Sequence, residues 1–420
     1  MKKLPEQKSE QSVLVSKKPT FIDIFAGCGG LSLGLLQAGW QGLFAIERNS
    51  DAFQTLRHNL IDSLGKPKFD WCDWLSKSNH SVEDIMENNH DNLISLRGQV
   101  DLLVGGPPCQ GFSPAGRRDP NDPRNQLIKI YLKFVEIIQP KIVLIENVKG
   151  ITSDFSDEDT KINYAKWLIE SLSKNYTVHS EILDTSTFGV PQKRHRFFLI
   201  AFRKGVNLKI QLEPFVAIEN NRAAFLLNKG INGIPVTIKE AISDLEVKLN
   251  GSVPSRDTKG FQELKYTQPL SEYQKIMNLG MGNLVSDTRL AKHKPSTVER
   301  FQKMIALSVQ MGRLNMSLSK EIKAGLGLKK SSIRVLDPNS PSPTITSMPD
   351  DLIHYCEPRA LTVRENARLQ GFPDWFEFKG QYTTGGDRRK FEVPRFTQVA
   401  NAVPPLIAEA IGLSLFNYLV

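Results

Sequence analysis

The sequence is poor in cysteine and has neither a long apolar run nor a metal-binding pattern. Its 420 residues include four cysteines, Cys28, Cys72, Cys109 and Cys356, with no Cys-x-x-Cys spacing. This spacing argues against a disulfide framework and against a zinc site, so we expect no bound metal and only free thiols. Apolar runs such as residues 142–145 are far too short to cross a membrane, so no membrane association is expected.

The amino-terminal residues also lack the apolar segment of a secretory signal. Residues 1–19 are polar and charged, so we predict a flexible leader and a cytoplasmic protein. The composition, 40% hydrophobic and 24% charged, is that of a folded chain. A net charge of +9 with a pI near 9.2 favours a polyanionic partner such as nucleic acid, although charge alone does not separate nucleic-acid binders from other basic proteins.

The apolar pattern divides the chain into two domains. In residues 20–204, short apolar runs alternate with amphipathic segments, which predicts an α/β fold with a doubly wound, largely parallel sheet. In residues 205–394 this alternation is lost, and we predict a smaller, irregular second domain. Within it, Thr362 and Glu365 have the spacing of a helix capping box, and Gly371 is placed to end that helix. The apolar segment 395–420 is predicted to pack back on the sheet domain.

The motif FIDIFAGCGG, residues 21–30, runs from an apolar strand into a glycine turn and a helix. Backbone amides at such a turn can hold a nucleotide-like cofactor at the sheet edge. The glycines do not form the G-x-G-x-x-G pattern and no G-K-[ST] follows, so pyrophosphate and P-loop binding lose support. After the next strand, Glu47 is placed to hold ribose hydroxyl groups. Glycine turns after strands are also common for structural reasons alone.

The motif GGPPCQGFSPAGRR, residues 105–118, places Cys109 after two prolines at the end of the apolar run VDLLV. Ligands of a doubly wound sheet collect beyond the carboxyl ends of its strands, which is where Cys109 would lie. A buried cysteine is usually inert, and this interpretation suits Cys28 and Cys72. It suits Cys109 poorly, because the glycine-, proline- and arginine-rich loop that follows is long enough to close over a substrate.

Two further motifs lie where strands of the predicted sheet end or begin. LIENVKG ends an apolar strand with Glu146, and PQKRHRFFLI places Arg194 and Arg196 on one face if the segment is extended. Alone, Glu146 would be interpreted as a surface carboxylate and the arginines as a solvated basic turn. Together with Cys109, they predict a carboxylate, a thiol and two guanidinium groups at one edge of the sheet.

Taken in order, six motifs resemble those of the DNA (cytosine-5) methyltransferase family of restriction-modification type: FIDIFAGCGG, GGPPCQGFS, ENVKG, QKRHR, RALTVRENARLQGFP and QVANAVPP. The resemblance implies a class I, Rossmann-like fold that uses S-adenosyl-L-methionine and releases S-adenosyl-L-homocysteine. It implies methyl transfer to carbon 5 of a cytosine flipped out of a specific short double-stranded DNA sequence, through a covalent cysteine adduct at carbon 6. Residues 20–204 plus 395–420 would form the catalytic domain, and residues 205–394 the target-recognition domain.

The resemblance also implies roles for individual residues. Cys109 would be the nucleophile, and Glu146 would contact the cytosine at ring nitrogen 3 and the exocyclic amine. Arg196 would hold Glu146 and reach the cytosine carbonyl oxygen, and Arg194 would help hold the flipped nucleotide. The cofactor would be bound by Asp23, Phe25, Ala26, Gly27, Gly29, Gly30, Glu47, Asp73, Pro107 and Asn401. DNA would be bound by Gln110, Ser113, Arg118, Arg124, Thr344 and Thr346. The family usually has glycine where this chain has Ala400.

The resemblance leaves partners and competing functions to be tested. We expect a monomer acting on double-stranded DNA, prokaryotic or phage-encoded and nucleoid-associated when bound, with a cognate restriction endonuclease acting independently. Alternatives are an RNA cytosine-5 methyltransferase, a catalytically silent DNA-binding relative and a nicotinamide-dependent oxidoreductase. The size of the region between Phe202 and Arg359 argues for duplex DNA. A silent relative should have lost Cys109, Glu146 or Arg196, and an oxidoreductase leaves the cysteine and arginine motifs unexplained.

Overall fold

The structure is a computed structural model that describes residues 18–108, 126–157, 160–232, 234–328, 330, 332–384, 388 and 391–419. Five predicted site residues lie outside the described residues: Cys109, Gln110, Ser113, Arg118 and Arg124.

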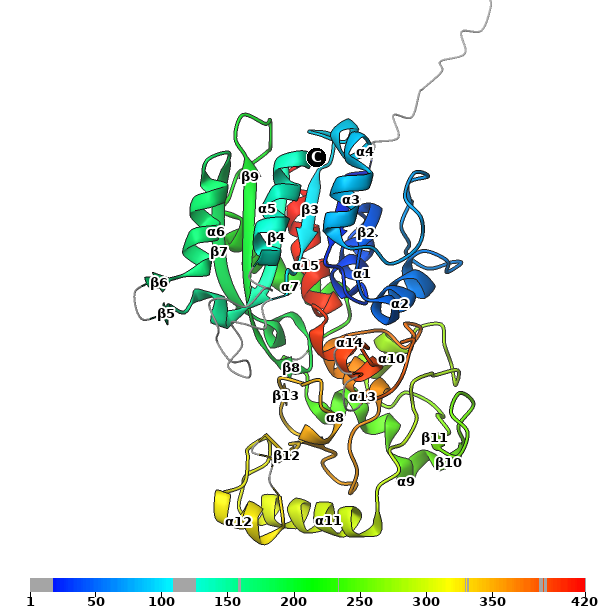
Figure 1. Ribbon diagram of the computed structural model, residues 1–420. Helices are drawn as coiled ribbons and strands as arrows, with labels where there is room; N and C mark the ends of the chain where they lie inside the picture. The colour runs from blue at the N-terminus through cyan, green and yellow to red at the C-terminus, as the bar shows by residue number, and fades with distance from the viewer. Residues whose placement is uncertain are drawn as a thin grey trace, which may run out of the picture.

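A six-stranded sheet forms the centre of the upper part of the molecule in Figure 1. Its strand order is β2-β1-β3-β4-β9-β7. The strands are β1 (Thr20–Ile24), β2 (Gln41–Ile46), β3 (Leu102–Gly105), β4 (Ile142–Val148), β7 (Tyr176–Asp184) and β9 (His195–Arg203). β1 pairs in parallel with β2 and β3, and β3 with β4, whereas β9 runs antiparallel to both of its neighbours. The predicted doubly wound, largely parallel sheet is confirmed, with β9 as its reversed strand.

Helices cover both faces of this sheet, because successive strand residues point to opposite sides. Phe21 belongs to one buried cluster, whereas its neighbour Ile22 belongs to the other. The helices of this part are α1 (Gly30–Gln37), α2 (Ser50–Leu60), α3 (Val82–Asn88), α4 (His90–Ser95), α5 (Gln126–Ile138), α6 (Tyr164–Ser173), α7 (Pro214–Asn228), α14 (Arg395–Asn401) and α15 (Pro405–Phe416). α3, α4 and α5 pack against one another, and α15 packs against α1 and α7.

The carboxy-terminal helix α15 returns to the sheet part, as the sequence predicts. Figure 1 shows it, in red, beside the first elements of the chain. At Gly34, α1 and α15 approach so closely that an added Cβ would lie 2.5 Å from the Cβ of Ala408. The stretch Arg395–Phe416 is long and apolar enough to cross a membrane by length and composition, but 83% of its most apolar window is buried within the protein. It is therefore placed as a core helix.

The remaining elements are short and irregular and lie mostly in the lower part of Figure 1. The strands are β5 (Phe155–Asp157), β6 (Thr160–Ile162), β8 (Gln192–Lys193), β10 (Ser252–Pro254), β11 (Gln262–Leu264), β12 (Arg334–Val335), β13 (Ser342–Pro343) and β14 (Leu352–Ile353). The helices are α8 (Ile238–Ile242), α9 (Val247–Asn250), α10 (Glu272–Met277), α11 (Pro295–Gln310), α12 (Lys320–Gly325) and α13 (Val363–Gln370). A small separate core containing Phe301 and Met304 underlies α11, far from the sheet.

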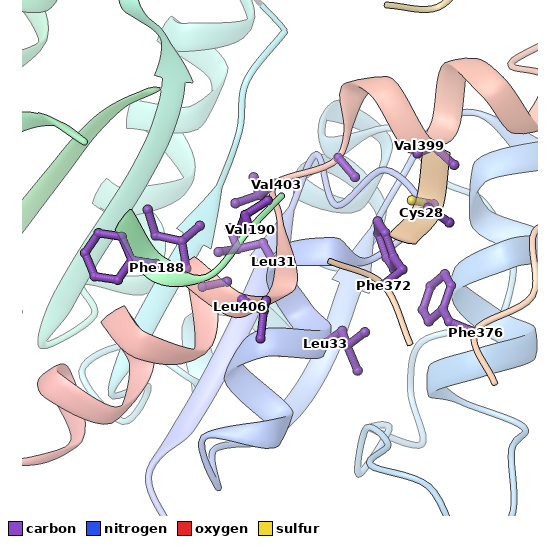
Figure 2. Close-up of a cluster of buried hydrophobic side chains, with 14 of the residues drawn as sticks. Cys28, Leu31, Leu33, Phe188, Val190, Phe372, Phe376, Val399, Val403 and Leu406 are labelled. Carbon is purple, nitrogen blue, oxygen red and sulfur yellow. The ribbon is translucent and has the colours of Figure 1, made fainter. Parts of the chain in front are cut away.

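Helix α13 connects the two parts of the molecule. Its capping box, Thr362 with Glu365, and its left-handed end at Gly371 (φ 85°) form as predicted. The chain then passes under the glycine turn, where Figure 2 shows Phe372 and Phe376 beside Cys28 and Val399. Burial of these aromatic rings holds the second part of the chain against the sheet part.

Candidate active site

The carboxyl ends of three parallel strands meet at one edge of the sheet. Ile24, Gly105 and Ile145 lie in one row of the β1-β3-β4 register. The residues that follow each of them therefore lie side by side at this edge, and they include Phe25 and Glu146. This is the place where ligands of such sheets bind.

Glu146 is the carboxylate at the centre of this edge. Arg196 lies on β9 and pairs with Val148 of β4, so its side chain is on the same face of the sheet as that of Glu146. Arg196 Nε is 3.0 Å from Glu146 Oε1. Both side chains are largely buried: that of Glu146 is 11% exposed and that of Arg196 is 13% exposed. Burial raises the pKa of Glu146 above its ordinary value of 4.5, while the charges of Arg196 and Arg194 oppose that rise. The site thus holds a carboxyl group that burial biases toward its protonated form.

The start of the predicted nucleophile motif is held beside Glu146. An added Cβ at Gly106 would lie 3.2 Å from Glu146 Oε2. The buried Asn147 donates from Nδ2 to the carbonyl oxygen of Pro107 at 3.3 Å. These contacts fix the backbone to within two residues of Cys109, which itself lies outside the described residues.

Arg194 and Arg196 point to different partners. Arg194 is buried, and its Nη1 donates to the carbonyl oxygen of Ala400 at 2.7 Å. Its Nε has no hydrogen-bond partner among the described residues. Burial lowers the pKa of Arg194 well below its ordinary value, and the charge of Arg196 lowers it further. Ala400 lies within helix α14, where the backbone needs no glycine, so the departure from the family pattern is accommodated.

Two further carboxylates, Asp23 and Glu47, lie beside the glycine turn. Asp23 is fully buried, and its Oδ2 accepts from the Ser32 hydroxyl at 2.5 Å. Its Oδ1 has no partner among the described residues, and burial raises its pKa from 3.8 to about 7. Glu47 accepts from the backbone amides of Gly27 and Asn49 at 2.9 and 2.6 Å, and burial raises its pKa. The turn therefore holds two carboxyl groups ready for polar partners.

The turn itself has a strained and open backbone. Phe25 has a positive φ of 60°, which a residue with a side chain rarely adopts, and Gly27 and Gly29 also have positive φ. An added Cβ at Gly27 would meet no atom within 4 Å, whereas one at Gly30 would lie 2.3 Å from the carbonyl oxygen of Val403. Open space at Gly27, the unpaired oxygen of Asp23 and the adjacent Glu47 fit a nucleoside-type cofactor with a charged amino-acid portion.

The other predicted cofactor residues have varied surroundings. Ala26 donates its amide to the carbonyl oxygen of Ile46 at 3.0 Å, which joins the turn to β2. Pro107 is buried, whereas Asp73 and Asn401 are both exposed. The structure thus gathers Asp23, Glu47 and the glycine turn, whereas Asp73 and Asn401 lie exposed, and the cofactor-binding roles of all these residues remain predictions. Within the described ranges, no group of three or more His, Cys, Asp or Glu side chains could hold a metal ion.

The predicted DNA-contacting threonines lie next to the arginine segment. β13 pairs in parallel with β8, which directly precedes Arg194. Thr344 and Thr346 are exposed, and the Thr344 hydroxyl donates to the carbonyl oxygen of Lys193 at 3.3 Å. The Thr346 hydroxyl donates to Asp351 Oδ2 at 2.6 Å.

Sequence reasoning gave no role to Asn147, Gln192 or Ser32, although all three contact predicted site residues or their segments. Gln192 and Asn147 stand inside motifs that were recognised, which is the one signal that could have found them. Ser32 follows the glycine turn by one helical turn, and only its 2.5 Å contact with Asp23 reveals its part.

The sheet order, the glycine turn followed by an acidic residue after β2, and the carboxylate at the edge of β4 define a class I methyltransferase fold. The family model for C-5 cytosine-specific DNA methylases matches residues 19–417. The chain belongs to this family and is a DNA (cytosine-5)-methyltransferase.

Named relatives agree with this assignment. The type II methyltransferase M.DdeI of Desulfomicrobium norvegicum is 32% identical over 409 residues, covering 93% of this chain and 87% of the relative. A prophage-encoded E. coli protein, whose crystal structure is described as a candidate DNA modification methyltransferase, has a TM-score of 0.65 and 25% identity, covering 96% and 99% of the two chains. The S. pombe Dnmt2 methyltransferase, at a TM-score of 0.51 and 16% identity over 94% and 96% of the chains, shows the shared fold.

Proposed function

We propose that this protein methylates carbon 5 of one cytosine within a specific short sequence of double-stranded DNA, as the modification enzyme of a restriction-modification system. The observation that carries the residue assignment is the buried Glu146–Arg196 pair, 3.0 Å apart, beside the anchored backbone of residues 106–107. The names of the relatives do not favour the RNA methyltransferase, the silent DNA-binding protein or the oxidoreductase.

The chemistry needs covalent activation, because carbon 5 of cytosine is a poor nucleophile. The Cys109 thiolate forms a bond to carbon 6, and Glu146 gives a proton to ring nitrogen 3, which stabilises the charge that develops on addition. Arg196 orients the Glu146 carboxyl group and reaches the cytosine carbonyl oxygen. After transfer, the proton on carbon 5 passes to solvent, and the electron pair of that bond restores the double bond between carbons 5 and 6. The bond from sulfur to carbon 6 breaks, which regenerates the Cys109 thiolate, and ring nitrogen 3 returns its proton to Glu146.

Burial of Glu146 supports this role. A carboxyl group in water is ionised at neutral pH, whereas burial raises the pKa of Glu146 and favours the proton-carrying form. A free thiol has a pKa near ~8.5, so neighbouring positive charge is needed to favour the Cys109 thiolate. Arg194 and Arg196, or the positive charge of the cofactor, would supply that charge.

S-adenosyl-L-methionine supplies the methyl group when bound, and S-adenosyl-L-homocysteine remains. Asp23 and the backbone of Ala26, Gly27, Gly29 and Gly30 would hold its methionine portion, and Glu47 its ribose. Phe25 would lie against the adenine ring, Asp73 would bind the adenine amine, and Pro107 and Asn401 would close the pocket. The partly buried, left-handed Phe25 and the unpaired Asp23 Oδ1 support this arrangement.

The target base must leave the duplex, because none of these groups can reach it inside the base stack. We propose that residues 205–394 recognise the sequence, with Thr344 and Thr346 at the DNA and Gln110, Ser113, Arg118 and Arg124 closing on the flipped nucleotide. α7, at the start of this range, packs on α15 and β7. The enzyme would act as a monomer, because one active site serves one strand per binding event. It would also act independently of its cognate endonuclease. It would act in the cytoplasm, at the nucleoid.

The test is to incubate the purified protein with unmethylated plasmid and S-adenosyl-L-methionine, and to map 5-methylcytosine by bisulfite sequencing. We expect methylation at one short motif, and its loss in Cys109→Ser with cofactor binding kept. Undiminished transfer by Cys109→Ser would contradict the assigned nucleophile. No methylation by a wild-type protein that still binds cofactor would redirect the assignment to RNA or to a silent binding protein.

A further inference from the structure

Two buried glutamines that the reaction does not use meet inside the molecule. Gln192 and Gln370 are both 0% exposed, and Gln192 Nε2 donates to Gln370 Oε1. Gln192 Nε2 also donates to the carbonyl oxygen of Leu369 at 3.4 Å, and Gln370 Nε2 to that of Ala402 at 2.5 Å. Gln192 Oε1 accepts from the Ile345 amide at 3.1 Å. Buried amides are costly unless paired, and this chain of amides has all its ends paired to backbone.

The two amides join three segments that the proposed reaction must bring together. Gln192 lies on β8, two and four residues before Arg194 and Arg196. Ile345 lies between Thr344 and Thr346 in the loop after β13. Ala402 follows Asn401 at the end of α14. Figure 1 shows β8 and β13 together where the sheet part meets the lower part, and Figure 2 shows Val190 beside Val403.

Backbone pairing between β8 and β13 is too short to fix their relative position alone. Each strand has two residues, and the pairing is supported by the Ser342 amide donating to the Pro191 carbonyl oxygen at 2.9 Å. Isolated strand pairs of this size are marginal in water. The Gln192 side chain adds a bond of defined direction from the β8 side to the loop at Ile345. This bond links the loop directly to the segment that carries Arg196.

We propose that Gln192 is a positioning residue that couples the DNA-facing loop 344–346 to the cytosine pocket. When the loop is seated on the correct sequence, the Ile345–Gln192–Gln370 chain holds β8 so that Arg196 keeps Glu146 in place. An incorrect sequence shifts the loop and with it the arginine segment. This inference rests on the proposed roles of Glu146 and Arg196.

The first test compares wild type with Gln192→Glu on the mapped site and on sites that differ from it by one base pair. The carboxylate keeps the acceptor for the Ile345 amide and loses both donors. We expect kcat on the correct site to fall about tenfold or more, with KM for S-adenosyl-L-methionine unchanged within about twofold. The ratio of kcat/KM between correct and altered sites should fall by about tenfold.

A second variant keeps the proposal testable if Gln192→Glu does not fold. The double variant Gln192→Met, Gln370→Met replaces both side-chain amides by apolar side chains of similar size, so neither buried amide is left facing an apolar partner. The Ile345 amide and the Ala402 carbonyl oxygen lose their side-chain partners, so Tm should fall. We expect it to fold and to show the same losses of kcat and of sequence discrimination. The control is Gln274→Glu. Gln274 is also fully buried, and its Nε2 donates to the Lys239 carbonyl oxygen and to the Ser243 hydroxyl, away from the active site. It should lower Tm without lowering kcat.

Two results would overturn the proposal. One is a folded double variant whose kcat and discrimination ratio stay within about twofold of wild type. The other is a loss of kcat/KM of equal size on correct and altered sites, because a purely structural role predicts no change in their ratio. Failure of the proposed function would look different: wild type would methylate no DNA cytosine, or Glu146→Gln would remain fully active.

Discussion

At the scale of single residues, the environment of each ionisable group decides its chemistry. Glu146 and Asp23 are both carboxyl groups that burial shifts toward the protonated form, yet Glu146 is paired with Arg196 and Asp23 with the Ser32 hydroxyl. Glu146 is therefore suited to exchanging a proton with a cytosine base. Asp23 is suited to binding a charged group of a ligand in a buried pocket.

Asp23→Asn is predicted to change the pH dependence of stability. The folded protein has a pKa of about 7 at Asp23, against 3.8 in an exposed chain, so the folded state binds the extra proton between these values. Stability from this group is therefore greatest at low pH and is lost as pH rises toward 7. At 1.36 kcal/mol per pKa unit the loss is about 4 kcal/mol, and Asp23→Asn should remove it.

Thermal unfolding from pH 4 to 8 measures this effect. Wild type should lose Tm across that range, whereas Asp23→Asn should show a flatter profile and weaker cofactor binding. Ser32→Ala is the companion variant, because the Ser32 hydroxyl lowers the Asp23 pKa, so its removal should extend the wild-type slope to higher pH. Parallel profiles for wild type and Asp23→Asn would show that Asp23 does not titrate in this window.

Sequence motifs identify single residues better than they identify contacts. The types and order of Glu146, Arg194 and Arg196 could be predicted, because a carboxylate and two arginines at strand ends form a recognisable pattern. The partner of Arg194 could not, since the carbonyl oxygen of Ala400 lies 206 residues away in sequence. A backbone acceptor also cannot be predicted from side-chain type, because every residue has a carbonyl oxygen.

At the scale of elements, close approach between segments explains the glycines of the first turn and first helix. α1 packs on the start of α15, where Gly30 faces the backbone of Val403 and Gly34 faces Ala408. The apolar runs of β1, β2, β3, β4 and β9 and the return of α15 could be predicted from the sequence. β7 could not, because this strand at the edge of the sheet is mostly only half-buried or exposed and has no continuous apolar run. The reversal of β9 could not, because an apolar run reads the same in either direction and only its pairing with β4 sets its sense.

Gly30→Ala is predicted to destabilise the protein by about 2–3 kcal/mol. The new Cβ would lie 2.3 Å from the Val403 carbonyl oxygen, a backbone atom that cannot rotate away. Gly325→Ala is the control, because no atom lies within 4 Å of its Cβ position and its φ is not positive. It should leave stability unchanged or raise it by about 0.5 kcal/mol. Equal urea midpoints for Gly30→Ala and wild type would contradict the packing argument.

At the scale of the whole molecule, a buried charge network holds together the second part of the chain, residues 205–394. Arg368 on α13 is fully buried and reaches Asp374 at 2.6 Å, Asp244 at 3.2 Å and the carbonyl oxygen of Ala241 at 3.0 Å. Sequence analysis predicted the α13 cap but not this network, since basic and acidic residues on a short helix are usually solvent-exposed. Complete burial follows from the tertiary arrangement of α8, α13 and the segment after Gly371.

Arg368→Met should therefore cost much more stability than the loss of one ion pair at the surface. It leaves Asp244 buried without its positive partner and Asp374 with only the more distant Arg364, whose Nη1 lies 3.9 Å from Asp374 Oδ1. Loss of a buried charge partner typically costs about 3–5 kcal/mol. Lys303→Met, which breaks the exposed Lys303–Glu299 pair, should leave stability nearly unchanged.

The pH dependence separates charge from packing in this variant. Burial alone raises the pKa of Asp374, and in the intact protein the charge and hydrogen bonds of Arg368 hold it below its ordinary value. Without Arg368, both carboxyl groups should titrate at higher pH, so the folded state gains protons that the unfolded state has lost. The deficit of Arg368→Met, measured by urea unfolding, should then be largest near pH 8 and shrink as the pH falls toward 5. A deficit that is the same at both pH values would mean that lost side-chain volume, and not unpaired charge, accounts for the lost stability.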